Sequence, residues 1–446
     1  MKSGTKLNLG ILVDPHGNHP AAWLHHEAVL GAEIDARYYL QLAQKAEQGL
    51  FDFLFIADSP GLRQGNIQAF KRWPVYMAQF EPVTVLSALS MVTERLGLAA
   101  TVSTSYFEPF NLARQFASLD HLSGGRSAWN VVTTTNPSAG KNFGREHFED
   151  HATRYRRARE FLQIALGLWD SWDDDAFVRN AKTVEYFDPD KLHTLGHKGE
   201  FYSVRGPLDV PRPPQGRPVI IQAGGSDAGR ELAAETAEVV FCGERTFEAA
   251  KSFRADVHQR MARYGRSPDE LKSLANLTTV IGRTQAEAEE HFEFLQAKIH
   301  PDVGREAISI DTGYIDLSQV PIDQSIPPSV FPEDTERSKT YMKLVKDIAA
   351  DGNPTLEEVY RRYAPSRGGL LFVGTASQAV ELMGDWFTGG AADGFILTPA
   401  SLPTELNKFV DLVVPELQKR GLFRTEYEGK TLRENLHLRR PKSRYA

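Results

Sequence analysis

Cysteine is almost absent from this chain of 446 residues, and a long apolar run is missing altogether. The single cysteine, Cys242, excludes an internal disulfide and a cysteine-rich metal site. It stands in an apolar run that begins at Val239, so we expect a buried, unreactive thiol rather than a reactive one. Because no stretch of about 18 apolar residues is present, we expect no membrane-spanning helix.

The chain also lacks an excess of positive charge. Lys and Arg number 51 against 58 Asp and Glu, which gives a formal net charge of -7 at pH 7. Such a chain repels nucleic acid at long range, and we set nucleic-acid binding aside. The first residues lack the basic and apolar order of a secretory signal, so we expect a cytoplasmic protein. Hydrophobic residues make up 41%, enough for a large core.

The most regular feature is a recurring unit of a short apolar strand, a polar turn and an amphipathic helix. Eight such strands are predicted, at residues 7–13, 51–57, 96–102, 127–132, 219–222, 239–241, 274–280 and 394–397. Their apolar residues are continuous rather than alternating, as expected for parallel strands buried on both faces. An open sheet has the same local pattern. Eight units favour an α/β fold of the (β/α)8 TIM-barrel type, in a single domain over residues 1–446.

Apolar residues at helical spacing predict the outer helices. These cover residues 35–48, 82–93, 111–122, 154–172, 227–236, 247–264, 286–299 and 376–387, with a last one at 404–419. Residues 173–217, with strand-like pieces at 199–202 and 208–210, are predicted to form an inserted hairpin or lobe. Residues 301–368, with one helix near 336–349, are predicted to form an inserted lid. The charged C-terminal tail, 421–446, is predicted to be a solvated arm that wraps the barrel or a partner subunit.

Polar residues follow the predicted strands, at the end where a barrel of this type carries its site. In chain order these residues are Asp14, His16, Asp58, Ser103, Thr104, Asn130, Thr133, Gly224, Gly225 and Ser226. A buried aspartate needs hydrogen-bond partners, so Asp58 indicates polar neighbours at the mouth of the barrel, or equally a stabilised loop. The histidines at 16, 19, 25 and 26 lack the helical spacing of metal ligands, and we expect no metal site.

The sharpest local feature runs from Gln222 to Gly229, between an apolar strand and a predicted helix. Its glycines let a ligand approach the backbone, and amides with the Ser226 hydroxyl at a helix N-terminus favour a phosphate group. An ordinary N-cap at Ser226 fits the same residues. The segment has neither the lysine of a P-loop nor the glycine spacing of a dinucleotide-binding fold.

Two basic clusters are candidates for binding anions. The first opens the helix after the fourth strand and contains His151, Arg154, Tyr155, Arg156 and Arg157. Its Arg or Tyr side chains could hydrogen-bond the same phosphate, or its charges could simply be solvated. The second follows the second strand and contains Arg63, Lys71 and Arg72. These residues could attract a carboxylate or sulfonate, or form an ordinary solvated loop.

Several segments together point to one known family. They are residues 51–58, 81–104, 111–126, 129–133 with 142–144, and 373–375 with 393–397. Through them the chain resembles, over nearly its whole length, the bacterial-luciferase-like flavin monooxygenases. The branch is the one that contains nitrilotriacetate monooxygenase component A, dibenzothiophene-sulfone monooxygenase and long-chain alkane monooxygenase. Residues 134–137 depart from the turn expected after the fourth strand, and Lys141 stands where arginine is common.

The resemblance implies a two-component enzyme. Its cofactor would be reduced flavin mononucleotide (FMN), supplied by a separate NAD(P)H-dependent flavin reductase. With O2 it would oxygenate, and then cleave, a small organic substrate such as an aminocarboxylate, sulfone or sulfonate. The residues implied to contact FMN are Asp58, Ser103, Asn130, His151, Tyr155, Gly225 and Ser226, the last two and Tyr155 near the phosphate. Relatives imply a homodimer or homotetramer.

Near the flavin ring we expect Asn130 and His16 to hydrogen-bond or to handle protons, His16 because an imidazole titrates close to neutrality. Two other functions fit the same residues. One is a hydrolase or lyase on the same barrel, with Asp58 and His16 as acid and base. The other is a non-catalytic flavin- or phosphate-binding protein. A hydrolase would act without a reductant, which separates it from a monooxygenase.

Overall fold

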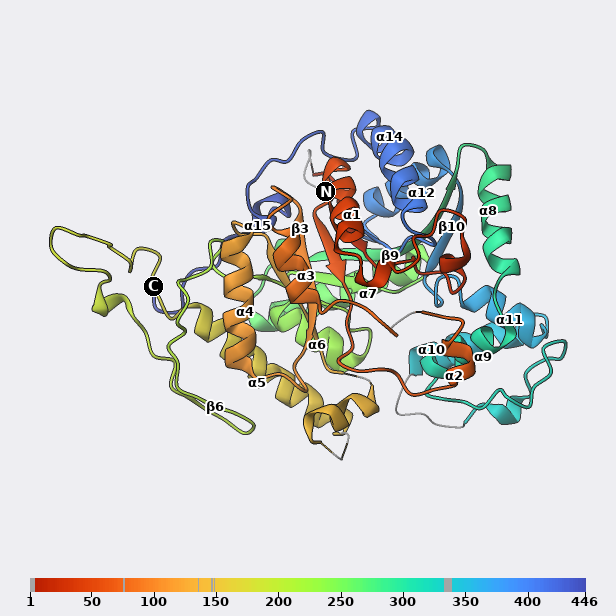
Figure 1. The fold of residues 1–446 in the computed structure, drawn as a ribbon, viewed down its shortest axis with the longest axis horizontal. Coiled ribbons are helices and arrows are strands. Elements are labelled where there is room, and N and C mark those ends of the chain that lie inside the picture. The colour runs from red at the N-terminus through yellow and green to blue at the C-terminus, as the bar shows by residue number, and fades with distance from the viewer. Residues whose placement is uncertain (1–4, 75–76, 135, 146, 148, 333–338) are drawn as a thin grey trace.

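A computed structural model of the chain describes residues 5–74, 77–134, 136–145, 147, 149–332 and 339–446 (Figure 1). Eight parallel strands lie at its centre: β1 (Asn8–Leu12), β2 (Phe53–Ile56), β3 (Gly97–Ser103), β4 (Ser127–Val132), β7 (Val219–Gln222), β8 (Val239–Cys242), β9 (Lys272–Gly282) and β11 (Gly394–Leu397). Strand β11 pairs with both β1 and β9, and β9 pairs with β8, so the sheet is closed. The predicted TIM-barrel fold is confirmed.

Both faces of the strands are buried, which explains their continuous apolar runs. In β2, Phe53 and Phe55 contact the filled interior of the barrel. Leu54 and Ile56, between them, belong to the larger core under the helices. Since successive side chains of a strand point to opposite faces, four apolar residues in a row serve two cores at once.

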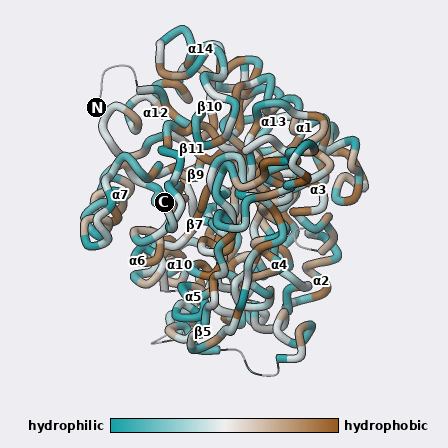
Figure 2. Tube along the Cα trace, turned by 90° about the vertical axis from the view of Figure 1, so that its left-hand side faces the viewer, coloured by the Kyte–Doolittle hydropathy of each residue, from teal (hydrophilic) through white to brown (hydrophobic). Residues whose placement is uncertain are grey.

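Helices surround the strands and match the predicted ones to within a few residues at most ends. They are α1 (Ala36–Gln48), α3 (Pro82–Leu89), α4 (Pro109–Leu122), α5 (His151–Trp169), α6 (Asp227–Thr236), α7 (Phe247–Met261), α8 (Gln285–Ala297) and α12 (Ala376–Thr388). The predicted helix at 404–419 is α13 (Thr404–Lys408), a π-helical turn (Phe409–Val413) and α14 (Val414–Lys419). Hydrophobic and hydrophilic residues alternate along outer helices such as α7 (Figure 2).

The sequence analysis missed one strand of the large sheet, the strand that pairs with the outer part of β9. Strand β9 has 11 residues and pairs both inside the barrel and outside it. Its first part closes the barrel, while its residues from Leu277 onward also pair with β10 (Leu370–Thr375). Strand β10 extends the sheet outside the ring, next to the inserted segment. Its short, glycine-containing run follows a long irregular stretch, which hid it.

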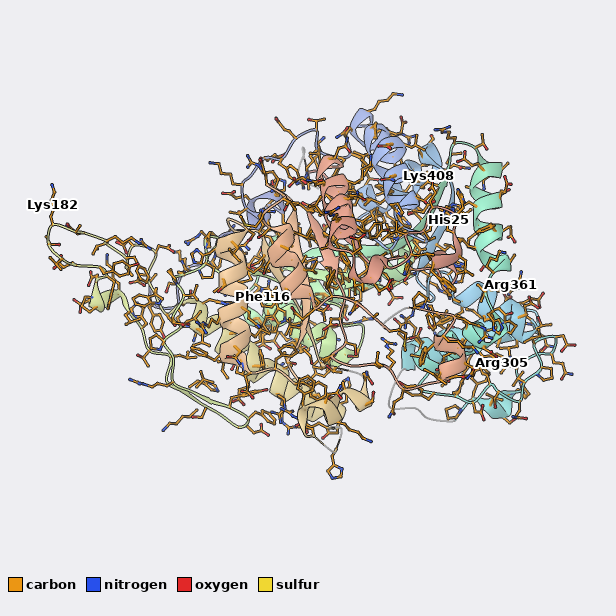
Figure 3. All side chains as sticks on the ribbon, in the orientation of Figure 1. His25, Phe116, Lys182, Arg305, Arg361 and Lys408 are labelled. Atoms are coloured by element: carbon orange, nitrogen blue, oxygen red, sulfur yellow. The ribbon has the colours of Figure 1, made fainter. Side chains whose placement is uncertain are left out.

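The insertion at 173–217 projects away from the barrel, with Lys182 near its tip (Figures 1 and 3). It contains a short antiparallel pair, β5 (His197–Lys198) and β6 (Ser203–Val204). The prediction of strands at 199–202 and 208–210 is wrong. Residues 199–202 form the turn between β5 and β6, closed by a hydrogen bond from the Gly199 N–H to the Tyr202 carbonyl at 3.0 Å.

The insertion at 301–368 is a helical lobe, on the side of the barrel opposite to 173–217 (Figure 1). It contains α9 (Pro301–Asp311), α10 (Lys339–Ala350) and α11 (Leu356–Tyr363), and it packs against α2 (Ile67–Phe70). Only α10 was predicted, and the predicted start of that helix lies outside the described residues. The lobe has a separate apolar core that includes Val303, Val345 and Tyr360.

The C-terminal arm closes the amino-terminal end of the barrel. Its short helix α15 (Leu432–Asn435) and the residues after it place Leu432, Leu436 and Leu438 in the interior core. Arg433 donates hydrogen bonds to both oxygens of Glu238, just before β8, at 2.6 and 3.0 Å. Arg424 pairs with Asp52, just before β2, at 2.6 Å.

The expectation of a solvated arm is therefore wrong for these residues, because the apolar positions among the charges contact the barrel interior. None of the described helices combines the length and the apolar character that a membrane crossing needs.

The buried ion pair between Arg433 and Glu238 predicts a large loss of stability when Arg433 is replaced. Because Arg433→Ala leaves Glu238 charged and buried, it should lower the free energy of unfolding by about 3–5 kcal/mol. The matched control is Arg440→Ala, which removes a more exposed pair of the same arm, to Asp174; it should cost about 1 kcal/mol or less. Urea unfolding of the two variants measures the difference, and equal losses would contradict it.

Candidate active site

A cavity of about 240 Å³ opens at the carboxyl ends of the barrel strands. We call it the mouth cavity. It is lined by Asp58, Ser59 and Arg63, by residues 131–134, by Tyr155, by residues 222–224, and by Gly229 and Leu232. These residues come from the ends of β4 and β7, from the segments that follow β2, β4 and β7, and from α5 and α6. Of the strand ends that the sequence analysis selected, those of β2, β4 and β7 therefore converge on this cavity, whereas the residues selected after β1 and β3 do not line it.

The glycine-rich turn after β7 forms one wall of the mouth cavity. A side chain at Gly224 would meet the Gly229 backbone at 2.7 Å, so only glycine lets this turn fold back on α6. Ser226 caps α6 by accepting the Gly229 N–H at 3.1 Å. Open space surrounds Gly225, and the remaining first-turn N–H groups have no acceptor within the helix. The turn thus offers amides to an anion, and it also contains the N-cap.

Tyr155 faces this turn from α5. Its hydroxyl lies 3.4 Å from the Ser226 hydroxyl. The His151 ring, one turn earlier in α5, lies with its centroid 4.7 Å from that of Tyr155. Burial, together with the charge of Arg154, lowers the pKa of His151 below its ordinary value. The structure therefore brings together the three residues predicted near a phosphate, Tyr155, Gly225 and Ser226, with His151 behind them.

Asp58, which follows β2, also lines the mouth cavity. Gln79 donates a hydrogen bond to its carboxylate at 2.7 Å. Burial nevertheless raises the pKa of Asp58 above its ordinary value, with the Gln79 hydrogen bond acting in the other direction. Asp58 is thus a polar lining group with a fixed partner, as the sequence indicated.

Ser103 and Asn130 lie deeper than the lining. The Ser103 hydroxyl is hydrogen-bonded to that of Thr134, a lining residue. Asn130 donates to the Thr101 hydroxyl at 2.9 Å, and its Oδ1 atom is buried with no hydrogen-bond partner among the described residues. Both side chains therefore belong to the polar layer beneath the mouth cavity.

Gln222 was not assigned a role from the sequence. It ends β7, is buried, and lines the mouth cavity, yet its Nε2 atom has no hydrogen-bond partner among the described residues. Since a buried donor left unpaired is costly, a ligand acceptor at this position would satisfy it. Its place as a polar residue at a strand end was the available signal.

His16, four residues past the end of β1, does not line the mouth cavity. Its Nε2 atom lies 3.4 Å from a Glu33 oxygen, and burial lowers its pKa although Glu33 opposes this. The partner of its ring is therefore Glu33, whereas the side-chain partner of Asp58 is Gln79. The proton-handling role of His16 stays a prediction.

The histidine-rich loop also contains a group of potential metal ligands. His25, His26 and Glu27 have ligand atoms that all lie within 4.8 Å of one another. They lie near α8 and Lys408 (Figure 3) and do not line the mouth cavity. The Nδ1 atom of His25 already accepts the Glu27 N–H at 3.3 Å. The expected absence of a metal site stays a prediction.

The second basic cluster does not act as a unit. Arg63 lines the mouth cavity. Lys71 is the exposed C-cap of α2, and the partly buried Arg72, just after that helix, donates to the Gln68 carbonyl. Of the three predicted anion-binding residues, only Arg63 is at the candidate site.

Asp14, which follows β1, is a buried carboxyl group with a strongly raised pKa. Burial raises its pKa to about 7, although the His16 N–H and the charge of Arg367 favour its ionised form. Burial raises the pKa of Tyr38 and of Tyr39, both from α1, and the nearby Asp14 carboxylate adds to this rise. Asp14 was noted in the sequence as a strand-end residue without a function.

A closed (β/α)8 barrel with polar residues gathered at the carboxyl ends of its strands has the arrangement of a barrel enzyme. Residues 16–393 match the profile of the luciferase-like monooxygenases, and the chain belongs to that family.

Full-length relatives agree with the family and with the predicted branch. The chain is 45% identical to N-acetyl-S-(2-succino)cysteine monooxygenase of Bacillus subtilis (strain 168), over 99% of this chain and 98% of the relative. It is 42% identical to nitrilotriacetate monooxygenase component A of Aminobacter aminovorans, over 100% and 99%. These relatives confirm the resemblance inferred from the sequence.

Solved structures agree with the fold. A long-chain alkane monooxygenase superposes with a TM-score of 0.85 at 34% identity, covering 97% of this chain and 96% of that one. A riboflavin lyase, solved with modified FMN and riboflavin, gives 0.86 at 30% identity with the same coverage.

The Asp14 carboxyl predicts a pH-dependent stability. Because its folded pKa of about 7 lies above the ordinary value of 3.8, the folded state binds more protons between these values, and stability falls as pH rises through that interval. The slope due to this group is at most about 1.4 kcal/mol per pH unit. Asp14→Asn should remove this pH dependence. The free energy of unfolding of the variant should therefore rise relative to that of the parent from pH 4 to pH 7, and the difference should stay constant above pH 7. Unfolding free energies across pH measure this; a constant difference would contradict it.

Proposed function

We propose that this protein is the oxygenating component of a two-component system. It takes reduced FMN from a separate NAD(P)H-dependent flavin reductase and uses O2 to oxygenate a small organic substrate. The observation that carries the proposal is the turn at residues 224–229, which presents helix N-terminal amides beside the Tyr155 hydroxyl at the edge of the mouth cavity.

The residues present fit FMN at its phosphate end. The open space at Gly225 admits a phosphate against the backbone, and the Ser226 and Tyr155 hydroxyls lie at its side. The turn also contains the Asp227 carboxylate, which pairs with Arg260 at 2.6 Å. This ion pair reduces the repulsion between the carboxylate and a bound phosphate. Two relatives support the assignment: one is named component A, and one was solved with modified FMN.

At the ring end, the unpaired Nε2 of Gln222 and Oδ1 of Asn130 are a donor and an acceptor without partners in the described structure. Such a pair matches a ring that carries both carbonyl oxygens and N–H groups. Asp58, held by Gln79, adds a fixed acceptor when ionised. These residues orient the ring, and the inserted lobe beside the cavity excludes water.

Reduced FMN, when bound by these residues, would supply the two electrons with which one oxygen atom of O2 enters the substrate and the other leaves as water. Oxygen inserted on a carbon next to nitrogen or sulfur gives a product in which that bond breaks. We place the reaction in the cytoplasm, where the reductase finds its nicotinamide coenzyme, and we propose a homodimer or homotetramer.

An anaerobic titration tests the function. Reduced FMN added to the protein should give a saturable spectral change, and admission of O2 with a flavin reductase and NADH should oxygenate the substrate. A protein that shows no saturable change with reduced FMN is not a flavin monooxygenase.

Charge at the turn provides a sharper prediction. Ser226→Asp keeps a good N-cap but puts a carboxylate beside the phosphate, which should weaken FMN binding by about 1–4 kcal/mol, or about fivefold or more. The matched control is Thr246→Asp, because Thr246 caps α7 in the same way but does not line the cavity.

Riboflavin lacks the phosphate group, so its affinity reports the contribution of the ring without that of the phosphate. Its affinity should be nearly the same in the parent and in Ser226→Asp. If Ser226→Asp leaves the FMN affinity unchanged, or weakens riboflavin as much as FMN, the phosphate does not lie at this turn. Fluorescence titration measures all four affinities.

A further inference from the structure

The guanidinium group of Arg154 joins the two ends of the segment that leads from β4 to α5. Arg154 is buried, with 9% of its surface exposed. Its Nη1 atom donates a hydrogen bond to the Thr134 carbonyl at 3.0 Å, and its Nε atom donates to the Glu149 carbonyl at 3.2 Å. Because one rigid, planar group makes both bonds, the chain just after β4 is held against the start of α5.

Thr134 is the residue through which this contact reaches the mouth cavity. It lines that cavity, and its hydroxyl is hydrogen-bonded to the hydroxyl of Ser103, the last residue of β3. The Ser103 hydroxyl also accepts the Ser105 N–H at 3.1 Å. Thr134 is thus held on two sides, at its carbonyl by Arg154 and at its hydroxyl by Ser103. Loss of the Arg154 side chain would therefore loosen one wall of the cavity.

Arg154 and Tyr155 are neighbours in sequence, yet their side chains reach different partners. Successive residues of an α-helix are turned by about 100° around its axis. The Tyr155 hydroxyl lies beside that of Ser226, at the turn that offers its amides to an anion. Arg154 instead reaches the Thr134 carbonyl, and it is not among the residues that line the mouth cavity. The sequence left open whether Arg154 hydrogen-bonds a phosphate, and these contacts favour a different role.

We propose that Arg154 is a positioning residue of the flavin site. It holds the Thr134 backbone so that Thr134 and Ser103 contact the flavin away from its phosphate. The inference rests on the proposed function and deepens it, because it adds a residue that acts without touching the cofactor. Such support matters, since a binding group works only within about 0.5 Å of its proper place. The affinity for a flavin therefore depends on Arg154 whether or not that flavin carries a phosphate.

Fluorescence titration of the parent and two variants with FMN and with riboflavin tests the proposal. Arg154→Gln, which cannot bridge both carbonyls, should weaken the two flavins by the same factor, about fivefold to fiftyfold. Arg154→Lys keeps the positive charge but lacks the planar group with several donors. It should therefore also weaken both flavins, again by equal factors.

The matched control is Arg266→Gln. Arg266 is a partly buried arginine that likewise donates to main-chain carbonyls, those of Ala234 at 3.0 Å and Ala237 at 2.6 Å. It does not line the mouth cavity. Its replacement should lower stability and leave the affinity for either flavin unchanged. If Arg154→Gln changes the flavin affinities no more than Arg266→Gln does, Arg154 supports only the fold and the proposal is wrong.

A direct bond from Arg154 to the phosphate would give another pattern. Arg154→Gln would then weaken FMN and leave riboflavin unchanged, and Arg154→Lys would restore the FMN affinity through its charge. Either of these results overturns the proposal. If Arg154→Gln does not fold, the riboflavin affinity of Arg154→Lys decides, because only a positioning role lowers it.

Hydrogen exchange tests the same contact in the protein without flavin. Backbone amides of residues 131–134 should exchange faster in Arg154→Gln than in the parent, whereas those of residues 222–229 should be unchanged. Equal exchange of residues 131–134 in both proteins would overturn the proposal. If the parent binds both flavins and the Arg154 variants bind them equally well, only this inference fails. If the parent binds no flavin, the proposed function fails and this inference fails with it.

Discussion

The buried ion pair between Arg433 and Glu238 fastens one end of the barrel, and the position of the site depends on it. With this pair made, Leu432 and Leu436 fill the interior from the amino-terminal side. Apolar side chains such as Phe53, Phe241 and Leu274 fill the barrel interior below its polar layer. The carboxyl ends of the strands are left as the place where polar side chains, backbone amides and a small molecule meet.

At that end two different kinds of group line neighbouring cavities. The turn at Gly224 and Gly225 presents backbone amides, whereas a cavity of about 410 Å³ between the barrel and the inserted lobe is lined by Arg63 and Arg367. The first set belongs to the barrel and is fixed by a glycine contact that no side chain could replace. The second set depends on an insertion with its own apolar core. A barrel of constant construction can thus accept different substrates through changes in one lobe.

The sequence was informative wherever the signal was local. The bounds of α6 were predicted as they are found, because a glycine turn, an N-cap and an apolar spacing agree there. The Arg367 to Asp311 contact joins residues 56 positions apart in an irregular insertion, and no spacing rule predicts it. The arm was predicted to be solvated because its charges hid leucines at 432, 436 and 438, which pack in the barrel interior.

Cys242, the only thiol of the chain, has a consequence for durability. It is fully buried in the core under the helices, and burial raises its pKa to about 12. Since oxidants attack the thiolate form, this sulfur is unreactive at neutral pH. Because the sequence contains no other cysteine, thiol oxidation and disulfide exchange are closed to this chain as routes of inactivation while it stays folded.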